Sequence, residues 1–167
     1  HFNGNNFQFP INVKEENNAL HGLVFDKTFD LIDTDLNEKS ATLVFEYDEK
    51  KESLGFPYTY TVQLIYRFTE DNLDLEMIIK NTDTKAFPFT VGWHPYFLSS
   101  NLSKSSIAFN GDKKMILDKR NITIDSKKVD TSKGTAIKNN QFDDCWSLNS
   151  DEIIFTTPEY KLKFNAT

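Results

Sequence analysis

Apolar and polar side chains alternate along three segments in the first half of the chain, at residues 41–47, 59–68 and 73–80. A period of two residues is typical of a β-strand with one buried face, so each segment is predicted to be a strand. Residues 69–72 read Thr-Glu-Asp-Asn, a short polar run that favours a hairpin turn. The second and third strands are therefore predicted to pair antiparallel within a larger sheet.

Shorter strand candidates follow at residues 87–90, 106–109, 114–117, 152–156 and 160–164. Because turn-favouring residues separate them and no long stretch of period 3.6 interrupts them, the predicted fold class is all-β, a mostly antiparallel sandwich. Residues 121–140 are polar and are predicted to form a long surface connection. Strand patterns at residues 2–9 and 160–164 would leave unpaired edges at both ends, so the sandwich is expected to be incomplete.

The composition predicts a packed core. Of the 167 residues, 38% are hydrophobic and 14% are aromatic, which is more than a disordered chain carries. No internal repeat or linker divides the sequence, so residues 1–167 are predicted to form a single, partial domain. Residues 55–58 read Gly-Phe-Pro-Tyr and are predicted to be an architectural turn, since glycine permits unusual backbone angles and proline donates no amide hydrogen.

Charge and cysteine content narrow the function. The net charge of -6 argues against a nucleic-acid partner, because such binding relies on clustered Lys and Arg. The lysine pairs at 113–114 and 127–128 are predicted to be solvated loop or edge positions. Cys145, the only cysteine, favours a reducing, cytoplasmic location, and its thiol is predicted to be buried and inert. No apolar run approaches the ~20 residues of a membrane helix, so no membrane partner is expected.

Two of the three histidines have distinctive neighbours. His21 is followed by Gly22, while His94 lies in the aromatic run Trp-His-Pro-Tyr-Phe at residues 93–97. Aromatic faces pack against the C–H face of a sugar, and His, Asp and Asn side chains hydrogen-bond its hydroxyls. The combination is typical of a sugar-binding site.

Four motifs occur in the order found in one enzyme family: N-x-L-H-G at 18–22, G-F-P-Y at 55–58, W-H-P-Y-F at 93–97 and D-x-C-aromatic at 143–146. Over nearly its whole length the chain resembles the aldose 1-epimerases, a galactose mutarotase-like family. The resemblance implies a galactose mutarotase-like β-sandwich, or supersandwich. It also implies an isomerase that interconverts the α and β anomers of a hexose by acid–base ring opening, without a metal or organic cofactor.

The resemblance implies roles for three matching residues. His94 is similar to the family's general acid, which protonates the ring oxygen, and a histidine with an ordinary pKa of about 6.5 can do so at neutral pH. His21 is similar to the second catalytic histidine, which positions the sugar, and Asp143 to the carboxylate that accepts a bond from a sugar hydroxyl. Further candidates for substrate contact are Asn18, Trp93 and Tyr96.

Each candidate also has a plainer interpretation. A lone histidine is more often a structural hydrogen-bonding residue. Asp143 can instead form a turn, and Asp144 is the alternative in register. Trp93 and Tyr96 fit a core as well as a sugar platform, and Asn18 fits a turn better than a substrate contact.

The chain departs from the family at three points. The family's substrate-contacting arginine lies upstream of N-x-L-H-G, whereas both arginines here, Arg67 and Arg120, lie downstream. The family's glutamate base follows the D-x-C-aromatic motif and is expected outside these residues, since Glu152 and Glu159 have ordinary strand and turn neighbours. Leu98 stands where close relatives of galactose mutarotase often have Asn, which indicates a more distant branch.

Two other functions fit these residues. One is a non-catalytic carbohydrate-binding module of the same fold. The other is a sandwich domain of a larger carbohydrate-active enzyme that cuts polymers with carboxylates, although the spacing of the two histidines argues against it. A small-molecule sugar is the expected partner. The sequence defines neither the sugar nor the oligomeric state, and its negative charge disfavours a phosphorylated sugar unless local Lys or Arg reverse this.

Overall fold

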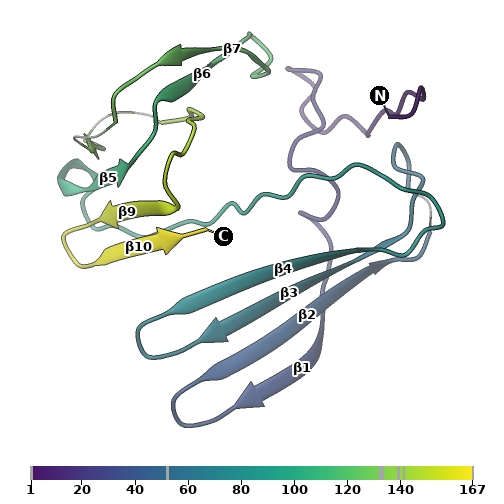
Figure 1. Cartoon of the computed structure of the whole chain (residues 1–167), viewed down its shortest axis with the longest axis horizontal. Coiled ribbons are helices and arrows are strands. Elements are labelled where there is room, and N and C mark those ends of the chain that lie inside the picture. The colour runs from purple at the N-terminus through teal and green to yellow at the C-terminus, as the bar shows by residue number, and fades with distance from the viewer. Residues whose placement is uncertain (1, 52, 132–133, 139, 141, 167) are drawn as a thin grey trace. The chain divides into compact units, whose positions relative to one another are not determined.

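The computed structural model describes residues 2–51, 53–131, 134–138, 140 and 142–166 and divides into two compact units, His1–Val91 (unit 1) and Gly92–Thr167 (unit 2) (Figure 1). Apart from the short 3-10 helix η1 (Leu102–Lys104), every regular element of the described residues is a β-strand. The predicted all-β class is therefore confirmed. No helix in the described ranges is long and apolar enough to cross a bilayer. The single domain over residues 1–167 stays a prediction.

Unit 1 is built on one four-stranded antiparallel sheet in which sequence neighbours pair, in the order β1-β2-β3-β4 (Figure 1). Its strands are β1 (Asp30–Leu36), β2 (Ala41–Glu49), β3 (Tyr60–Phe68) and β4 (Leu73–Asn81). The three strands predicted from alternation are confirmed as β2, β3 and β4. The predicted hairpin joins β3 to β4, where the amide of Thr69 donates to the carbonyl of Asn72 at 2.9 Å.

The strand register gives this sheet one apolar and one polar face. Val62 of β3 lies between Tyr47 of β2 and Ile79 of β4, so these side chains share a face. On the other face Gln63 donates from Nε2 to Oε2 of Glu46 at 2.7 Å. The apolar face is therefore the one on which a core can form.

The core of unit 1 covers one end of the apolar face. The buried residues are Phe56, Tyr58, Tyr60 and Val62, and the half-buried residues packed on them are Phe7, Phe9, Leu23, Val24, Phe29, Tyr47, Leu64, Ile79 and Phe87. The Phe56 ring lies 5.0 Å from that of Tyr58 and 5.2 Å from that of Phe87, both edge-on. Such pairs contribute about 0.5–1.5 kcal/mol each beyond their buried area. Aromatic packing therefore dominates this core.

Gly55 sets the turn that leads into the core. Its φ is +81°, a left-handed conformation that glycine adopts without strain. A Cβ added there would lie 2.2 Å from the carbonyl oxygen of Gln8 and 2.8 Å from Cα of Phe9. The predicted architectural role of the Gly-Phe-Pro-Tyr turn is confirmed, because its glycine lets the N-terminal segment approach in backbone contact.

Unit 2 contains a four-stranded antiparallel sheet in the order β10-β9-β5-β8 and a two-stranded ribbon, β6-β7. Its strands are β5 (Ser106–Phe109), β6 (Lys113–Leu117), β7 (Thr123–Lys128), β8 (Thr135–Ala136), β9 (Glu152–Thr156) and β10 (Lys161–Asn165) (Figure 1). The predictions at 106–109, 114–117, 152–156 and 160–164 are confirmed.

Three predictions from the pattern are wrong. Residues 87–90 are not a strand, because Pro88 has no amide hydrogen to give a ladder. Residues 121–140 are not only a connection, since they contain β7 and β8; all six side chains of β7 are exposed, so no apolar alternation marks it. At residues 2–9 only the Phe2–Asn5 bridge forms, around a tight turn.

Candidate functional site

The candidate residues fall into two groups, one in each unit. Unit 1 carries Asn18 and His21, whereas unit 2 carries Trp93, His94, Tyr96 and Asp143.

Asn12, which no sequence motif singled out, holds the loop before His21. The amide of Leu20 donates to Oδ1 of Asn12 at 2.7 Å, and Nδ2 of Asn12 donates to the carbonyl of Leu20 at 2.9 Å. Asn18 pairs through its backbone with Val13, and its Nδ2 donates to Oε2 of Glu16 at 3.0 Å. Asn18 therefore has the turn role that its sequence favoured, and its contact with substrate stays a prediction.

His21 has an unusual backbone. Its φ is +66° and that of Gly22 is +71°, so two consecutive residues are left-handed. A histidine there is uncommon and costs of order 1–3 kcal/mol, and such strain concentrates at functional positions. The side chain is exposed, with its ring 6.0 Å from that of Phe25. The loop therefore presents the imidazole at the surface of unit 1.

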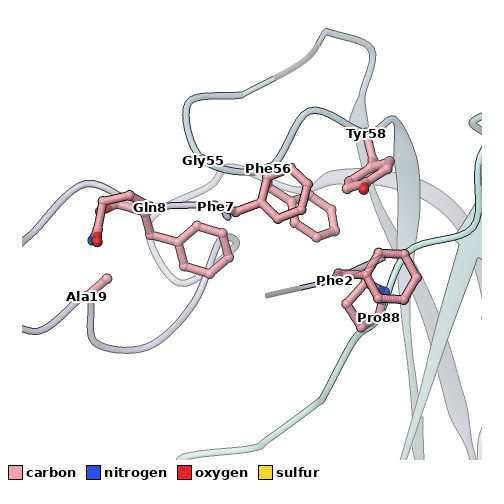
Figure 2. A pocket seen from close by; sticks show the side chains of 9 residues that line it. Phe2, Phe7, Gln8, Ala19, Gly55, Phe56, Tyr58 and Pro88 are labelled. Atoms are coloured by element: carbon pink, nitrogen blue, oxygen red, sulfur yellow. The ribbon is translucent and has the colours of Figure 1, made fainter. Parts of the chain in front are cut away.

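Two hollows open in unit 1. The first, of about 350 Å³, is lined by Phe2, Phe7, Gln8, Phe9, Ala19, Gly55, Phe56, Tyr58 and Pro88. Figure 2 shows Gln8 and Ala19 at one side of it and Phe2 with Pro88 at another. The second, of about 240 Å³, is lined by Phe9, Gly22, Leu23, Val24, Phe56, Tyr60, Val62, Ile79 and residues 87–91. The first includes Ala19, two residues before His21, and the second includes Gly22, which directly follows His21.

Tyr60 borders the second hollow with a buried hydroxyl. The residue is 4% exposed, and among the described residues its hydroxyl has no hydrogen-bond partner. Burial, assisted by the nearby Glu49 carboxylate, raises the pKa of Tyr60 to about 12, so the hydroxyl keeps its proton at neutral pH. Tyr47 differs, because its hydroxyl donates to Oε2 of Glu49 at 2.8 Å.

The His94 segment presents aromatic rings on unit 2. The His94 ring lies 5.1 Å from that of Tyr96, which is 88% exposed. The Trp93 ring lies 6.3 Å from that of Phe97, edge-on, and both are partly exposed. Tyr96 therefore lies outside any core, beside the proposed acid.

The segment is anchored just after these residues. The Phe97 ring lies 5.0 Å from that of Phe164 on β10 and 6.2 Å from that of Phe155 on β9. The Tyr160 hydroxyl donates to the carbonyl of Leu98. The aromatic run thus ends on a fixed sheet, which limits how far His94 can move.

Both glutamates that follow Asp143 in the chain already have partners. The Ser100 hydroxyl donates to Glu159, and this bond holds the pKa of that carboxyl below its usual range. Glu152 forms an ion pair with Nζ of Lys163 at 2.5 Å. These contacts support the expectation that neither residue is the catalytic base.

The motif around Asp143 lies along β6. Lys114 forms a β-bridge with Trp146, and Nζ of Lys114 lies 2.6 Å from Oδ1 of Asp144 and 5.2 Å from the centroid of the Trp146 ring. Asp144 thus forms an ion pair, and both Asp143 and Asp144 are exposed. Cys145 is also exposed, so the predicted burial of its thiol is wrong. Residues 142–145 lie outside the described strands.

Comparison with known proteins identifies a family. The family model described as Aldose 1-epimerase matches residues 1–167. This match confirms the resemblance that the four motifs indicated.

Individual relatives match over parts of their length. Among the curated proteins of Escherichia coli K12, the uncharacterized YihR is 32% identical over 103 residues, covering 61% of this chain and 32% of YihR. The uncharacterized YphB is 28% identical over 94 residues, covering 56% of this chain and 30% of YphB. The aligned segments thus span about a third of each relative.

A solved structure shows the fold. The crystal structure of a galactose mutarotase-like protein from Clostridium acetobutylicum superposes with a TM-score of 0.80 at 19% identity, covering 92% of this chain and 52% of that chain. The predicted galactose mutarotase-like β-sandwich is therefore confirmed. The chain spans about half the length of this neighbour.

Proposed function

The chain belongs to the aldose 1-epimerase family, and from this premise we propose that it interconverts the α and β anomers of a hexose by acid–base ring opening. Family membership and the mutarotase-like fold support an epimerase kind of function on a sugar. The sugar is the proposed small-molecule partner, and the reaction uses no metal or organic cofactor. The cytoplasmic location and the absence of nucleic-acid and membrane partners remain predictions.

One observation carries the proposal. The hollow of about 240 Å³ in unit 1 is lined by Gly22, which follows His21, and by Val91, which lies three residues before His94. The hollow therefore lies beside the His21 loop, which supports a sugar site in unit 1.

The proposed mechanism assigns one proton transfer to this chain. His94 protonates the ring oxygen, while His21 and Asp143 hold the sugar in the reactive orientation. A second group must remove the proton of the anomeric hydroxyl. We propose a glutamate from outside these 167 residues, because the partners of Glu152 and Glu159 occupy both local candidates.

A non-catalytic carbohydrate-binding module remains the second candidate. The observation that favours it is that Glu152 and Glu159, the two glutamates after Asp143, both have partners already. A module of this kind binds hexose but leaves mutarotation at its spontaneous rate. Polarimetry and a binding assay on one preparation separate the two functions.

Substituting the two adjacent aspartates separately tests the site. Asp143→Asn is expected to raise KM about tenfold, because the carboxylate that accepts a sugar hydroxyl is lost. Asp144→Asn is the matched control, because Asp144 already pairs with Lys114 and this partly exposed pair contributes only about 0–1 kcal/mol to stability. Initial mutarotation rates, measured by polarimetry over a range of sugar concentrations, give KM for each variant. A raised KM in Asp144→Asn but not in Asp143→Asn contradicts the assignment.

A further inference from the structure

The two edges of the β1-β2-β3-β4 sheet differ in how they are protected. β1, at one edge, breaks register between Leu31 and Asp33, and its sequence DLIDTDL carries three aspartates and no basic residue. A bulge and repeated like charges keep an edge strand from pairing with another chain. β4, at the opposite edge, has nine residues in unbroken register with β3, no proline and charges of both signs (Figure 1). Of the two edges, β4 is therefore the one suited to accept another strand.

The outward hydrogen-bonding groups of β4 belong to its odd-numbered residues. At the two ends of the β3-β4 ladder, the amide of Thr69 donates to the carbonyl of Asn72 at 2.9 Å, and the amide of Thr82 donates to the carbonyl of Thr59 at 3.2 Å. Because hydrogen-bonded rungs alternate along an antiparallel pair, the even-numbered residues of β4 bond to β3 and the odd-numbered ones direct their amides and carbonyls away from it. No strand in the part of the chain that the structure describes pairs with this outer edge.

An antiparallel copy of β4 fits this edge in the register centred on Met77, the one register in which all nine residues pair. Met77 then lies opposite Met77, and Leu75 lies opposite Ile79. These rungs join the outward groups of both strands, so main-chain hydrogen bonds form across them. Asp74 lies opposite Lys80, and this rung occurs twice because a two-fold axis repeats every contact.

The charges of this rung complement each other. Asp74 and Lys80 are both exposed, and no ion pair between described residues involves either of them. Arg67, which lies opposite Asp74 on β3, pairs instead with Glu76 at 2.8 Å. Opposite charges placed directly across a rung stabilise strand pairing, whereas like charges destabilise it. The edge of β4 is therefore complementary to itself.

The neighbouring registers lose this complementarity. Outward groups meet only when odd-numbered residues face odd-numbered ones, so the nearest alternatives are centred on Glu76 or on Ile78. The first sets Glu76 opposite Glu76, which is a repulsive rung. The second sets Ile78 opposite Ile78 and leaves Asp74 beyond the end of the paired strand. In neither register does Asp74 face Lys80.

We propose that a second copy of this chain pairs antiparallel with the free edge of β4 in the register centred on Met77, so that the two sheets join into one continuous sheet. The apolar side chains of Leu75, Met77 and Ile79 then continue the apolar face across the joint. Ile79 also lines the hollow of about 240 Å³, so Leu75 of the second copy extends the wall of that hollow. The pairing goes beyond the proposed function and does not depend on it.

Exchanging the two charges tests the pairing. Sedimentation equilibrium measures the dimer dissociation constant of the protein, expressed with any coding sequence that flanks these residues. The unsubstituted protein is expected to form dimers. Asp74→Lys and Lys80→Asp are each expected to weaken dimerisation by about tenfold or more, because each sets like charges opposite in both rungs. The double variant Asp74→Lys/Lys80→Asp is expected to restore the dissociation constant to within about threefold.

Mixing the two single variants separates the charge effect from misfolding. One variant carries lysine at both positions and the other carries aspartate at both, so opposite charges meet in both rungs only in the mixed dimer. The equimolar mixture is expected to dimerise about tenfold more tightly than either variant alone, which an unfolded variant cannot do. Lys39→Asp makes the same change at an exposed position between β1 and β2 and is expected to leave dimerisation unchanged.

Cysteine cross-linking tests the register. Cys145 is the only cysteine, so Cys145→Ser provides a background without thiols. In that background Met77→Cys lies opposite its own copy at about 5.5 Å between Cα atoms, a distance that a disulfide spans, and oxidation is expected to link the dimer. Ile78→Cys lies opposite Glu76 and is expected to link poorly.

Four results would overturn the proposal. They are a monomer at every concentration, single variants that dimerise as well as the unsubstituted protein, a mixture no tighter than its components, and cross-linking of Ile78→Cys in place of Met77→Cys. Each of them leaves the proposed function standing, because polarimetry measures mutarotation separately.

Discussion

Replacing His94 with Ala is expected to slow catalysed mutarotation by about 100- to 10,000-fold, the usual contribution of a general acid. Without the imidazole the proposed proton donor to the ring oxygen is lost, while the proposed contacts of the sugar with His21 and Asp143 remain. The substitution is therefore expected to lower kcat more than it changes KM. Polarimetry of a freshly dissolved α-anomer measures it, on protein expressed with any flanking coding sequence and corrected for spontaneous rotation.

A neighbouring substitution controls for disturbance of the segment. Leu98 follows the aromatic run and is 84% exposed, and it has no role in the proposed site. Leu98→Ala is expected to leave the rate within about twofold, since surface substitutions cost little. A His94→Ala enzyme as fast as Leu98→Ala would remove His94 from the mechanism.

Gly55→Ala is expected to destabilise the protein by about 3 kcal/mol or more. The new methyl group would lie 2.2 Å from the carbonyl oxygen of Gln8, at a residue whose φ is +81°. All three atoms within 3 Å belong to the backbone, so relief requires the N-terminal segment to leave the core. The loss combines backbone strain with disrupted packing. Urea unfolding followed by tryptophan fluorescence or circular dichroism measures it.

Gly4→Ala separates the two causes. Gly4 has nearly the same φ, +78°, but a Cβ there would meet nothing within 4 Å. Its cost is therefore the left-handed conformation alone, at most about 1–2 kcal/mol. Equal losses in the two variants would show that the close approach of Gln8 to Gly55 contributes nothing to stability.

The sequence predicted the strands whose burial leaves a trace in the pattern. β2, β3 and β4 each have one face against apolar neighbours, so their residues alternate. β7 lacks this signal because both of its faces are exposed. β1 was missed because its burial is low along its whole length and acidic residues interrupt its apolar positions. At residues 87–90 a strand was predicted where none forms, because the apolar residues there line a hollow and do not pair with another strand.

Sequence motifs predicted part of the candidate site. The features that depend on how distant strands and loops align could not be predicted. The motifs around His21 and His94 indicated a sugar site. No local pattern indicated that Asn12 forms two hydrogen bonds with Leu20, eight positions away. Likewise, the lysine pairs at 113–114 and 127–128 lie opposite each other only once β6 and β7 are aligned. Pairing register is set by contacts between distant segments, which one sequence does not contain.

His21 and His94 are proposed to contact the same sugar, and an NMR titration of their ring signals measures whether they do. The chain has three histidines, so their ring protons can be assigned by single substitutions. Titration with the hexose that gives the fastest mutarotation is expected to shift the His21 and His94 ring signals along one saturation curve with one dissociation constant. A shift in only one of the two rings, or two curves with different midpoints, would contradict a shared site.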